Sequence, residues 1–436
     1  MINNKSQQIH FIGIGGIGVS ALAKYYINQG VKVSGSDLSS SEITDDLIKL
    51  GAQIFIGKHN KKNLPKNIGA VIYTAAVQKD NPELSEAKRR KLKVKSYAQV
   101  LGELTKKYKT ITVSGAHGKS TTTAMTALVL EKGHCDPLVI VGTKVREFGD
   151  SNFRPGLGGY FVLEADEWNK SFLNYRPQIA VLTNIDEEHL DIYKNIDHIE
   201  AVFKQFLTKV SKNGLIVANA DDKIVKKIAK ESGRQVIWYS LKDKETNLIK
   251  KTIRVAGDHN LLNALAAFRV GRALGVGQAE ILQALEGFSG TWRRFEFKGA
   301  INKAPVFDDY AHHPSEIKAT LVAAKKRFPF GRIISVFQPH QYRRLHSLFN
   351  DFTNAFDHSD ITCVLDVYDV AGREDSRAKK EVNSFKLAAA LSEKGKDARY
   401  MYQSQVSDFL KSEVKSNDAV IFMGAGDIYK LTQKIV

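Results

Sequence analysis

The segment KTITVSGAHGKSTTTAMTALVLEKG, residues 109–133, decides the fold class of this chain. It begins with a short β-branched run, passes through a turn that holds two glycines, and continues as a helical stretch that ends at Gly133. A strand that leads through glycines into a helix N-terminus presents unpaired backbone N–H groups to an anion. The segment therefore predicts an α/β domain with a phosphate-binding loop.

The turn is a shortened form of the P-loop. A full G-x-x-x-x-G-K-[ST] pattern requires glycine where this chain has Val113. The chemistry remains, because backbone N–H groups cradle phosphate oxygens, Lys119 neutralises the β/γ charge and Ser120 offers its hydroxyl to Mg²⁺. An ordinary strand–helix turn is the alternative. The residues that we expect at the phosphates of ATP are Gly115, Ala116, His117, Gly118, Lys119, Ser120 and Thr121.

Short β-branched runs alternate with amphipathic helical stretches from end to end, which is typical of parallel sheets with crossover helices. We expect an α/β fold of three domains. These are a Rossmann-like N-terminal domain at residues 1–107, a central P-loop-type ATPase α/β sheet at residues 108–294, and a Rossmann-like C-terminal domain at residues 295–436. The last boundary falls in GFSGTWRRFEFKGA, where turn residues interrupt the periodicity.

Length and composition agree with a multidomain globular protein. With 436 residues, 43% hydrophobic and 25% charged, the chain is too long for one hydrophobic core. Its formal charge of +17 comes from lysines scattered over amphipathic helices, which favours a solvated surface over a nucleic-acid site. The N-terminus has no signal pattern, and no apolar stretch reaches the roughly 18 residues of a membrane span. We expect a cytoplasmic monomer or homodimer with no nucleic-acid partner and no membrane insertion.

The chain contains two cysteines, Cys135 and Cys363, in apolar surroundings that are far apart in the sequence. This pattern predicts two buried thiols in a reducing compartment. A disulfide between them is not expected.

A second glycine motif lies near the N-terminus. Gly13, Gly15 and Gly18 form G-x-G-x-x-G between a strand and a helix, with Gly16 inside the motif, and Asp37 ends the next strand. Read alone, the pattern indicates NAD, with Asp37 on the ribose hydroxyls. Any nucleotide diphosphate can use the same cradle, and glycines needed only for tight strand–helix packing are a further alternative.

Acidic and polar side chains follow two strands of the central domain. Glu164-Ala165-Asp166-Glu167 comes after YFVL, and Asn184 and His189 come after IAVLT. The carboxyl ends of strands collect the ligand sites of α/β sheets. Carboxylates are hard oxygen ligands suited to Mg²⁺, whereas histidine is a less usual ligand for it and a surface role is the alternative for His189. The two segments predict a magnesium site beside ATP.

These features, in this order and across separate domains, resemble the Mur ligase family over essentially the whole chain. GAHGKST is similar to the family's ATP loop, EADE and TNIDEEHLD to its magnesium segment, and GDHNLLNALAA to its adenosine-contacting helix start. In the third domain FDDYAHHPSEI, FQPHQYRR and MGAGDIY resemble the member that adds the first amino acid. The resemblance implies an ATP-dependent carboxylate–amine ligase of cell-wall synthesis.

The resemblance also implies the reaction. ATP phosphorylates the lactyl carboxylate of UDP-N-acetylmuramate, the amine of L-alanine attacks the acyl phosphate, and phosphate leaves. A free carboxylate is a poor acyl donor, and phosphoryl transfer chiefly needs positioning and charge neutralisation. The implied cofactors are ATP and Mg²⁺. On this interpretation the first glycine loop holds the UDP pyrophosphate instead of NAD, and Asp37 lies near the uridine.

Carried over by position, the resemblance assigns further site residues. The implied metal ligands are Ser120, Glu164 and His189, and the implied nucleotide contacts are Asn260 and Asn263. The implied amino-acid pocket consists of Tyr310, His312, His340 and Arg344. A guanidinium can pair bidentately with a carboxylate, so Arg344 suits the carboxylate of alanine. Satisfied structural histidines are the alternative for His312, His313 and His340.

Several positions depart from the family pattern, among them Ala116 in place of threonine, Ala311 in place of glycine and Glu188 in place of aspartate. Gln341 stands where an arginine is typical, which weakens the grip on a small amino acid's carboxylate or indicates another amino acid such as glycine or serine. Trp168-Asn169-Lys170 replaces the small polar residues expected after the acidic segment. The sequence offers no physical account of this last change.

Three other interpretations remain open. A murein-peptide ligase attaches a whole tripeptide to the same sugar nucleotide, but a pocket closed by histidine, tyrosine and arginine suits a small amino acid. A nicotinamide-dependent oxidoreductase explains the first glycine motif and Asp37 but leaves the ATP loop and EADE without a role. A non-enzymatic nucleotide-binding regulator explains the loops but not the histidine and arginine cluster of the third domain.

Overall fold

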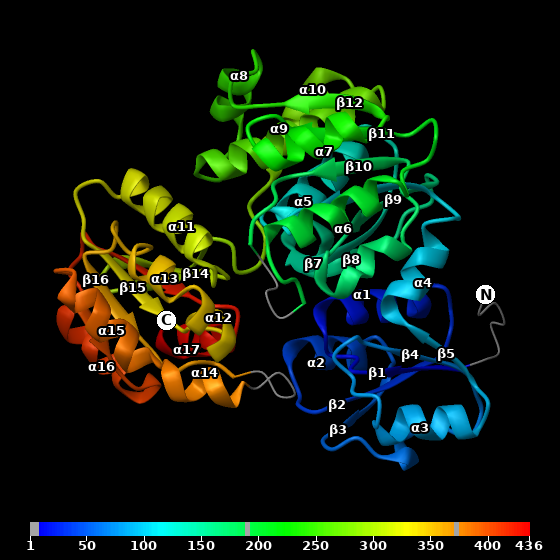
Figure 1. Ribbon diagram of the computed structural model, residues 1–436, viewed down its shortest axis with the longest axis horizontal. Coiled ribbons are helices and arrows are strands. Elements are labelled where there is room, and N and C mark those ends of the chain that lie inside the picture. Colours follow the sequence, from blue (N-terminus) through cyan, green and yellow to red (C-terminus); the bar gives the residue numbers. More distant parts are fainter. Residues whose placement is uncertain (1–7, 188–191, 370–374) are drawn as a thin grey trace. The chain divides into compact units, whose positions relative to one another are not determined.

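The computed structural model describes residues 8–187, 192–369 and 375–436, and it contains three β-sheets in chain order (Figure 1). These residues group into two compact units. The first unit comprises Met1–Arg254 and Asn260–Ser289, and the second comprises Val255–His259 and Gly290–Val436. The predicted α/β class with parallel sheets is confirmed.

The first sheet is parallel throughout and has the strand order β3-β2-β1-β4-β5. Its strands are β1 (Gln8–Ile12), β2 (Val33–Asp37), β3 (Gln53–Ile56), β4 (Ile68–Tyr73) and β5 (Lys93–Ser96). Its helices are α1 (Ile17–Asn28), α2 (Glu42–Lys49), the 3₁₀ helix η1 (Lys61–Asn63), α3 (Pro82–Arg89) and α4 (Tyr97–Leu104). The strand order reverses between β1 and β4, so the first glycine loop leaves β1 at the point where Rossmann-like sheets bind ligands.

Side-chain caps fix where these helices begin. Ser41 starts α2 and Ser96 starts α4, each accepting the backbone N–H three residues on. Asn81 accepts two N–H groups of α3, and Pro82 at the first helical position needs no partner for the N–H it lacks. The sequence therefore determines these boundaries locally.

The second sheet has seven strands in the order β12-β11-β10-β6-β9-β7-β8. Its strands are β6 (Lys109–Ser114), β7 (Leu138–Val145), β8 (Ser151–Arg154), β9 (Tyr160–Glu164), β10 (Ile179–Leu182), β11 (Leu215–Asn219) and β12 (Gln235–Tyr239). All neighbours are parallel except β7 and β8, which form an antiparallel hairpin. Because β6 lies between β9 and β10, the loops that follow these three strands meet at one edge of the sheet.

Helices connect the strands of this sheet. They are α5 (Lys119–Lys132), the 3₁₀ helices η2 (Arg146–Phe148) and η3 (Trp168–Asn174), α6 (Ile196–Leu207), α7 (Lys223–Glu231), α8 (Thr246–Thr252), α9 (Asp258–Ala273) and α10 (Gln278–Gly287). The sequence analysis did not anticipate the β7–β8 hairpin. Glycines and charged residues interrupt the apolar alternation in VGTKVREFGDSNFR, which weakens the signal of these strands.

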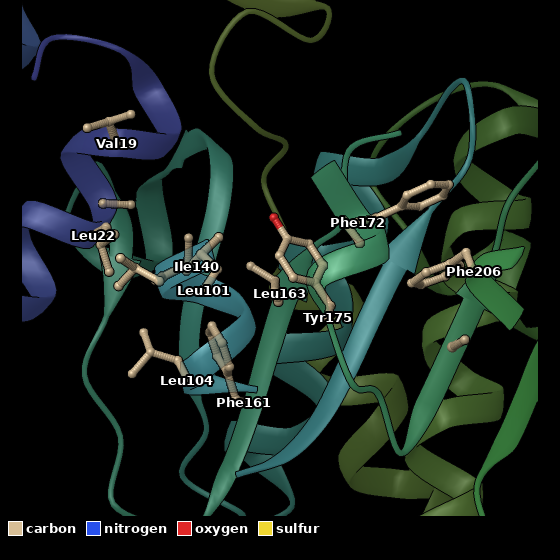
Figure 2. Close-up of a cluster of buried hydrophobic side chains, with 14 of the residues drawn as sticks. Val19, Leu22, Leu101, Leu104, Ile140, Phe161, Leu163, Phe172, Tyr175 and Phe206 are labelled. Atoms are coloured by element: carbon tan, nitrogen blue, oxygen red, sulfur yellow. The ribbon is translucent and has the colours of Figure 1, made fainter. Parts of the chain in front are cut away.

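The first two sheets share one hydrophobic core. Figure 2 shows side chains from α1, α4, β7, β9, η3 and α6 in a single buried cluster, with these residues labelled: Val19, Leu22, Leu101, Leu104, Ile140, Phe161, Leu163, Phe172, Tyr175 and Phe206. Helix α1 packs against β7 and β8. At this contact Asn152 donates to the hydroxyl of Ser20 at 2.8 Å, and Lys144 donates to Glu42 at 3.1 Å. The burial of this continuous apolar surface holds the two sheets in one unit.

The third sheet forms the second unit and has the order β13-β14-β18-β15-β16-β17. Its strands are β13 (Glu296–Ile301), β14 (Ala304–Asp309), β15 (Ile333–Phe337), β16 (Ile361–Val364), β17 (Ala398–Tyr400) and β18 (Ala419–Met423). Its helices are α11 (Pro314–Arg327), α12 (Tyr342–Ser347), α13 (Phe349–Thr353), α14 (Ser376–Glu381), α15 (Ser384–Glu393), α16 (Gln403–Glu413) and α17 (Ile428–Ile435). Only the β13–β14 pair is antiparallel among its described pairs.

The cysteines differ in their environments. Cys363 is buried in β16, whereas Cys135 is only partly buried, so the prediction of two buried thiols is wrong for Cys135. Cys135 lies in the loop between α5 and β7. Both thiols are free. Within residues 8–187, 192–369 and 375–436, no helix is long and apolar enough to cross a membrane.

Candidate functional site

The shortened P-loop connects β6 to α5, and its two glycines are required by the backbone. Gly115 has φ 141° and Gly118, the N-cap of α5, has φ 79°. A Cβ atom at Gly115 would lie 2.1 Å from the hydroxyl of Thr183, and one at Gly118 would lie 2.4 Å from the side-chain oxygen of Asn263. Any side chain there would combine a strained φ with a steric clash, so only glycine fits.

Asn184, which follows β10, holds this loop in place. The backbone N–H of His117 donates to Asn184 Oδ1 at 2.8 Å, and Asn184 Nδ2 donates back to the carbonyl of His117 at 3.0 Å. Ala116 donates its N–H to the Asn184 carbonyl at 3.0 Å, and the Thr183 hydroxyl donates to the His117 carbonyl at 2.7 Å. The loop is therefore supported by the neighbouring strand, although Val113 stands where the full pattern has glycine. The sequence analysis noted Asn184 but missed this role and Thr183.

Lys119 is the first residue of α5 and its ammonium lies inside the loop. It donates to the carbonyl of Gly115 at 2.6 Å and to that of Ala116 at 3.0 Å. It also donates to the carboxylate of Glu167, whose oxygens lie 3.2 and 3.1 Å away, and Asp166 Oδ1 lies 3.9 Å from the ammonium. Burial by itself lowers the pKa of Lys119, but the carboxylates of Glu167, Asp166 and Glu164 outweigh this effect and raise it. The ammonium therefore stays charged.

Glu164, at the end of β9, lies beside Ser120. It accepts the backbone N–H of Gly142 at 2.6 Å and a hydrogen bond from the Ser120 hydroxyl. Burial raises the pKa of Glu164, and the Gly142 N–H and the Lys119 ammonium oppose the rise. Two of the three predicted metal ligands thus lie together on adjacent elements. The third, His189, lies outside the described residues.

Helix α9 brings the predicted nucleotide contacts to the P-loop helix. Asn263 is buried and accepts a hydrogen bond from the hydroxyl of Thr122 at 3.0 Å. Its amide nitrogen lies 3.4 Å from the side-chain oxygen of Asn260, one turn earlier. Thr121 is buried in the first turn of α5. The structure therefore places Asn260, Asn263 and the P-loop at one edge of the second sheet.

The first glycine loop is bound by its own acidic residue. The N–H of Gly15 donates to Asp37 Oδ2 at 2.8 Å, and the N–H of Gly13 donates to the Ser36 carbonyl at 2.8 Å. A Cβ at Gly18 would lie 2.8 Å from the hydroxyl of Tyr97 on α4, so this glycine allows close helix packing. Gly16 is the N-cap of α1 and has no side-chain cap. Asp37 therefore shapes the loop, a contact that the sequence did not reveal.

The predicted amino-acid pocket residues of the second unit lie side by side. The rings of Tyr310 and His312 are 5.2 Å apart, and those of His312 and His340 are 5.7 Å apart. Arg344 Nη1 lies 3.3 Å from Nδ1 of His340. Because a guanidinium only donates, Nδ1 of His340 accepts and its ring proton is on Nε2. These four residues are at most 34 positions apart in the sequence, and strands β14 and β15 bring them together.

His313 and Gln341 have backbone roles in this unit. His313 is buried and caps α11, with Nδ1 2.7 Å from the Ser315 hydroxyl, which agrees with the structural alternative for this histidine. Gln341 precedes α12 with φ 68° and donates its N–H to the carbonyl of Tyr368 at 2.9 Å. A non-glycine residue at such a φ is strained, and strain of this kind clusters at functional sites.

Arg293 was missed by the sequence analysis, which assigned it to a linker. It is buried, donates to the carbonyls of Gly424 and Gly426, the latter at 3.0 Å, and lies 3.4 Å from Asp308. Its guanidinium lies 5.2 Å from the ring centre of Tyr310. Burial raises the pKa of Asp308 to about 6, although Arg293 works against this rise. Neither carboxylate oxygen of Asp308 has a hydrogen-bond partner within the described residues, so burial disfavours the charged form of this side chain.

Three family models match the chain in succession. They are the Mur ligase family catalytic domain at residues 8–109, the Mur ligase middle domain at residues 113–271, and the Mur ligase glutamate ligase domain at residues 293–426. The chain belongs to the Mur ligase family. The resemblance stated from the sequence motifs is thus confirmed, and so are the three-domain α/β fold and the assignment to the ligases.

Curated relatives of this Mur ligase match it over its full length. It is 40% identical to the UDP-N-acetylmuramate–L-alanine ligase of Clostridium botulinum strain Okra, covering 100% of this chain and 98% of the relative. It is 41% identical to the ligase of the same name from Clostridium tetani, covering 97% and 96%.

Solved structures show the same fold. The UDP-N-acetylmuramate–alanine ligase of Thermotoga maritima has a TM-score of 0.82 at 28% identity and covers 98% of each chain. A murein peptide ligase from Psychrobacter arcticus has a TM-score of 0.72 at 22% identity and covers 99% of this chain and 98% of its own. At that identity the second likeness shows the fold alone.

Proposed function

We propose that this Mur ligase joins L-alanine to the lactyl carboxylate of UDP-N-acetylmuramate in peptidoglycan precursor synthesis. ATP phosphorylates the carboxylate, the alanine amine attacks the acyl phosphate, and ADP and phosphate are released. The observation that carries the proposal is the full-length identity of 40% to a curated relative of that name. The reaction consumes ATP, so we place the enzyme in the cytoplasm. We propose that it is a monomer or a homodimer.

The central site residues supply what phosphoryl transfer requires. The P-loop N–H groups and the charged Lys119 neutralise the phosphates, and the buried position of the ammonium strengthens its effect. Asn260 and Asn263 contact the nucleotide in this proposal. Domains at residues 1–107, 108–294 and 295–436 would bind the UDP-sugar, ATP and the amino acid respectively.

The donor set beside Lys119 fits Mg²⁺. Three carboxyl groups, those of Glu164, Asp166 and Glu167, lie around the one ammonium of Lys119. Carboxylate and hydroxyl oxygens are the hard ligands that Mg²⁺ prefers. We propose Ser120, Glu164 and His189 as its ligands. When bound, the ion supplies positive charge to the β- and γ-phosphate oxygens.

We propose that the UDP pyrophosphate binds at the first glycine loop, at the N-terminus of α1. The N–H groups there attract anions, and the loop shape is held by the bond from Gly15 to Asp37. In the second unit, Arg344 would pair with the carboxylate of alanine, with Tyr310, His312 and His340 around it. The guanidinium of Arg344 is charged and can pair with that carboxylate.

Phosphate release tests the proposal. ATP, UDP-N-acetylmuramate and Mg²⁺ are incubated with L-alanine, glycine, L-serine or the tripeptide L-Ala-γ-D-Glu-meso-diaminopimelate as the acceptor. We expect the fastest release with L-alanine. Release with the tripeptide alone would make the protein a murein-peptide ligase. Faster release with glycine or serine would indicate that Gln341 accompanies a preference for another amino acid. No release with any acceptor would refute the assignment of this sugar nucleotide as the substrate.

A further inference from the structure

The P-loop lysine has no hydrogen-bond donor left for a phosphate. An ammonium carries three N–H donors. In Lys119 they meet the carbonyls of Gly115 and Ala116 and the carboxylate of Glu167. The two carbonyls belong to the loop itself and fix the ammonium within it. Glu167 is the contact that a β- or γ-phosphate oxygen must replace when it reaches Lys119.

Glu167 is held rigidly in this position. Its side chain is 2% exposed. Its backbone carbonyl accepts the N–H of Lys170 at 2.9 Å and a short hydrogen bond from the hydroxyl of the buried Tyr193. These two bonds fix the backbone of Glu167 beside Lys119, so only its side chain has to turn when a phosphate takes its place.

The turn after Glu167 contains Trp168-Asn169-Lys170, the segment that departs from the family pattern. Asn169 has φ 52° and Lys170 has φ 56°, so two successive non-glycine residues are left-handed inside η3. Asparagine tolerates this region better than most residues, whereas lysine does not. The N–H of Lys170 donates to the carbonyl of Glu167 at 2.9 Å across a turn in which Trp168 and the left-handed Asn169 are the central residues. Backbone strain of this kind is kept where the surroundings fix a functional geometry.

We propose that Glu167 is a positioning residue that occupies the phosphate's place on Lys119 until ATP arrives. The inference deepens the proposed function, since it rests on ATP binding at the P-loop. Before binding, the Glu167 carboxylate accepts from the ammonium and holds it inside the loop. ATP then displaces Glu167 from Lys119, and the exposed carboxylate repels the phosphates unless a cation that accompanies ATP compensates it.

If Glu167 occupies the phosphate's place on Lys119, its replacement should change the affinity for nucleotides in a definite direction. Replacement of the carboxylate by an uncharged amide removes a competitor for Lys119 and removes repulsion toward the phosphates. Glu167→Gln should therefore tighten the binding of ATP and ADP without Mg²⁺. The expected gain is about tenfold, because a hydrogen bond to an ionised group is roughly twice as strong as a neutral one. AMP lacks the phosphates that reach Lys119, so its affinity should not change.

The experiment is calorimetric titration of the full chain with ATP, ADP and AMP in EDTA. Glu167→Gln is compared with the wild type, with Glu167→Asp, which keeps the charge, and with Glu393→Gln, a control at an exposed position of α15. The proposal requires that only Glu167→Gln binds ATP and ADP more tightly. Unchanged or weaker ATP binding by this variant would overturn it, and so would an equal gain for AMP or a matching gain in Glu167→Asp.

The titration is independent of the acceptor substrates. If ligation of L-alanine fails while Glu167→Gln gains affinity for ATP, the proposed function is wrong and the proposed role of Glu167 is supported. If ligation succeeds while the variant shows no gain, the proposed role of Glu167 is wrong and the proposed function is supported. Should Glu167→Gln not fold, Glu167→Asp still decides the matter, since a gain in ATP affinity with the charge retained overturns the proposal.

Discussion

The hydrogen bonds between Asn184 and His117 allow a quantitative prediction about the P-loop. Asn184→Ala removes both side-chain bonds to the backbone of His117. The carbonyl of His117 keeps a partner, because the Thr183 hydroxyl also donates to it at 2.7 Å. The N–H of His117 loses its partner. The bond is partly buried, so water can replace it in part, and we expect a loss of about 1 kcal/mol in the free energy of unfolding.

Asn184→Asp should act differently. One carboxylate oxygen can still accept the N–H of His117, so the stability of the protein should change little. The other oxygen replaces Nδ2, which lies 3.0 Å from the carbonyl of His117, and repels it. The new negative charge also opposes the phosphates, at a cost on the order of 1–3 kcal/mol for an effective dielectric constant near 20, so the KM for ATP should rise about tenfold or more.

The assay combines thermal unfolding with phosphate release at varied ATP. Asn184→Ala should lower Tm by roughly 2–4 °C, as expected for about 1 kcal/mol in a domain of this size. Asn184→Asp should raise the KM for ATP with a smaller change in Tm. The control is Asn174→Asp, which adds the same charge at an exposed position. Wild-type ATP kinetics in Asn184→Asp, or a wild-type Tm and KM in Asn184→Ala, would show that the loop does not depend on Asn184.

Three further predictions concern charges. Lys119→Ala should abolish phosphate release while circular dichroism shows an intact fold, and near-normal turnover would contradict the loop assignment. Arg344→Ala should raise the KM for the amino acid far more than that for ATP, and equal effects in steady-state kinetics would remove Arg344 from the pocket. Asp308 has a pKa of about 6 in the folded protein against an ordinary value of 3.8, so the folded state binds more protons between these pH values than the unfolded state does. The free energy of unfolding should therefore fall as pH rises from about 4 to 6, by on the order of 3 kcal/mol, and then level off. In Asp308→Asn this slope in urea titrations should become smaller, and an unchanged slope would assign it to other groups.

Much of the fold follows from local sequence signals. Strand β10 (IAVL) is a continuous apolar run because both faces of a central parallel strand are covered. Several helices begin at residues that can cap them, as α4 does at Ser96. The β7–β8 hairpin was not predicted, because its glycines and charged residues interrupt the apolar alternation of the two strands. Its packing against α1 is visible only in the tertiary structure.

Some residues of the candidate site could be located from sequence motifs, and others could not. Motifs located Lys119, Ser120 and Glu164, because a loop that binds phosphate needs glycine, lysine and a hydroxyl at fixed spacing. No motif located Arg293. Its partners Gly424 and Gly426 are more than a hundred residues away in the chain, and an arginine in a linker has no local signal of burial.

The sequence by itself determined that this chain is a Mur ligase, because the glycine loops, the acidic segment and the third-domain motifs are each encoded within about ten consecutive residues. Tertiary structure alone decided that Asp37 binds Gly15, that Asn184 holds His117, and that Glu167 occupies the last donor of Lys119. These contacts join residues from different strands of a sheet. The order in which parallel strands pair sets which loops meet, and that order depends on burial of the whole core instead of any one segment.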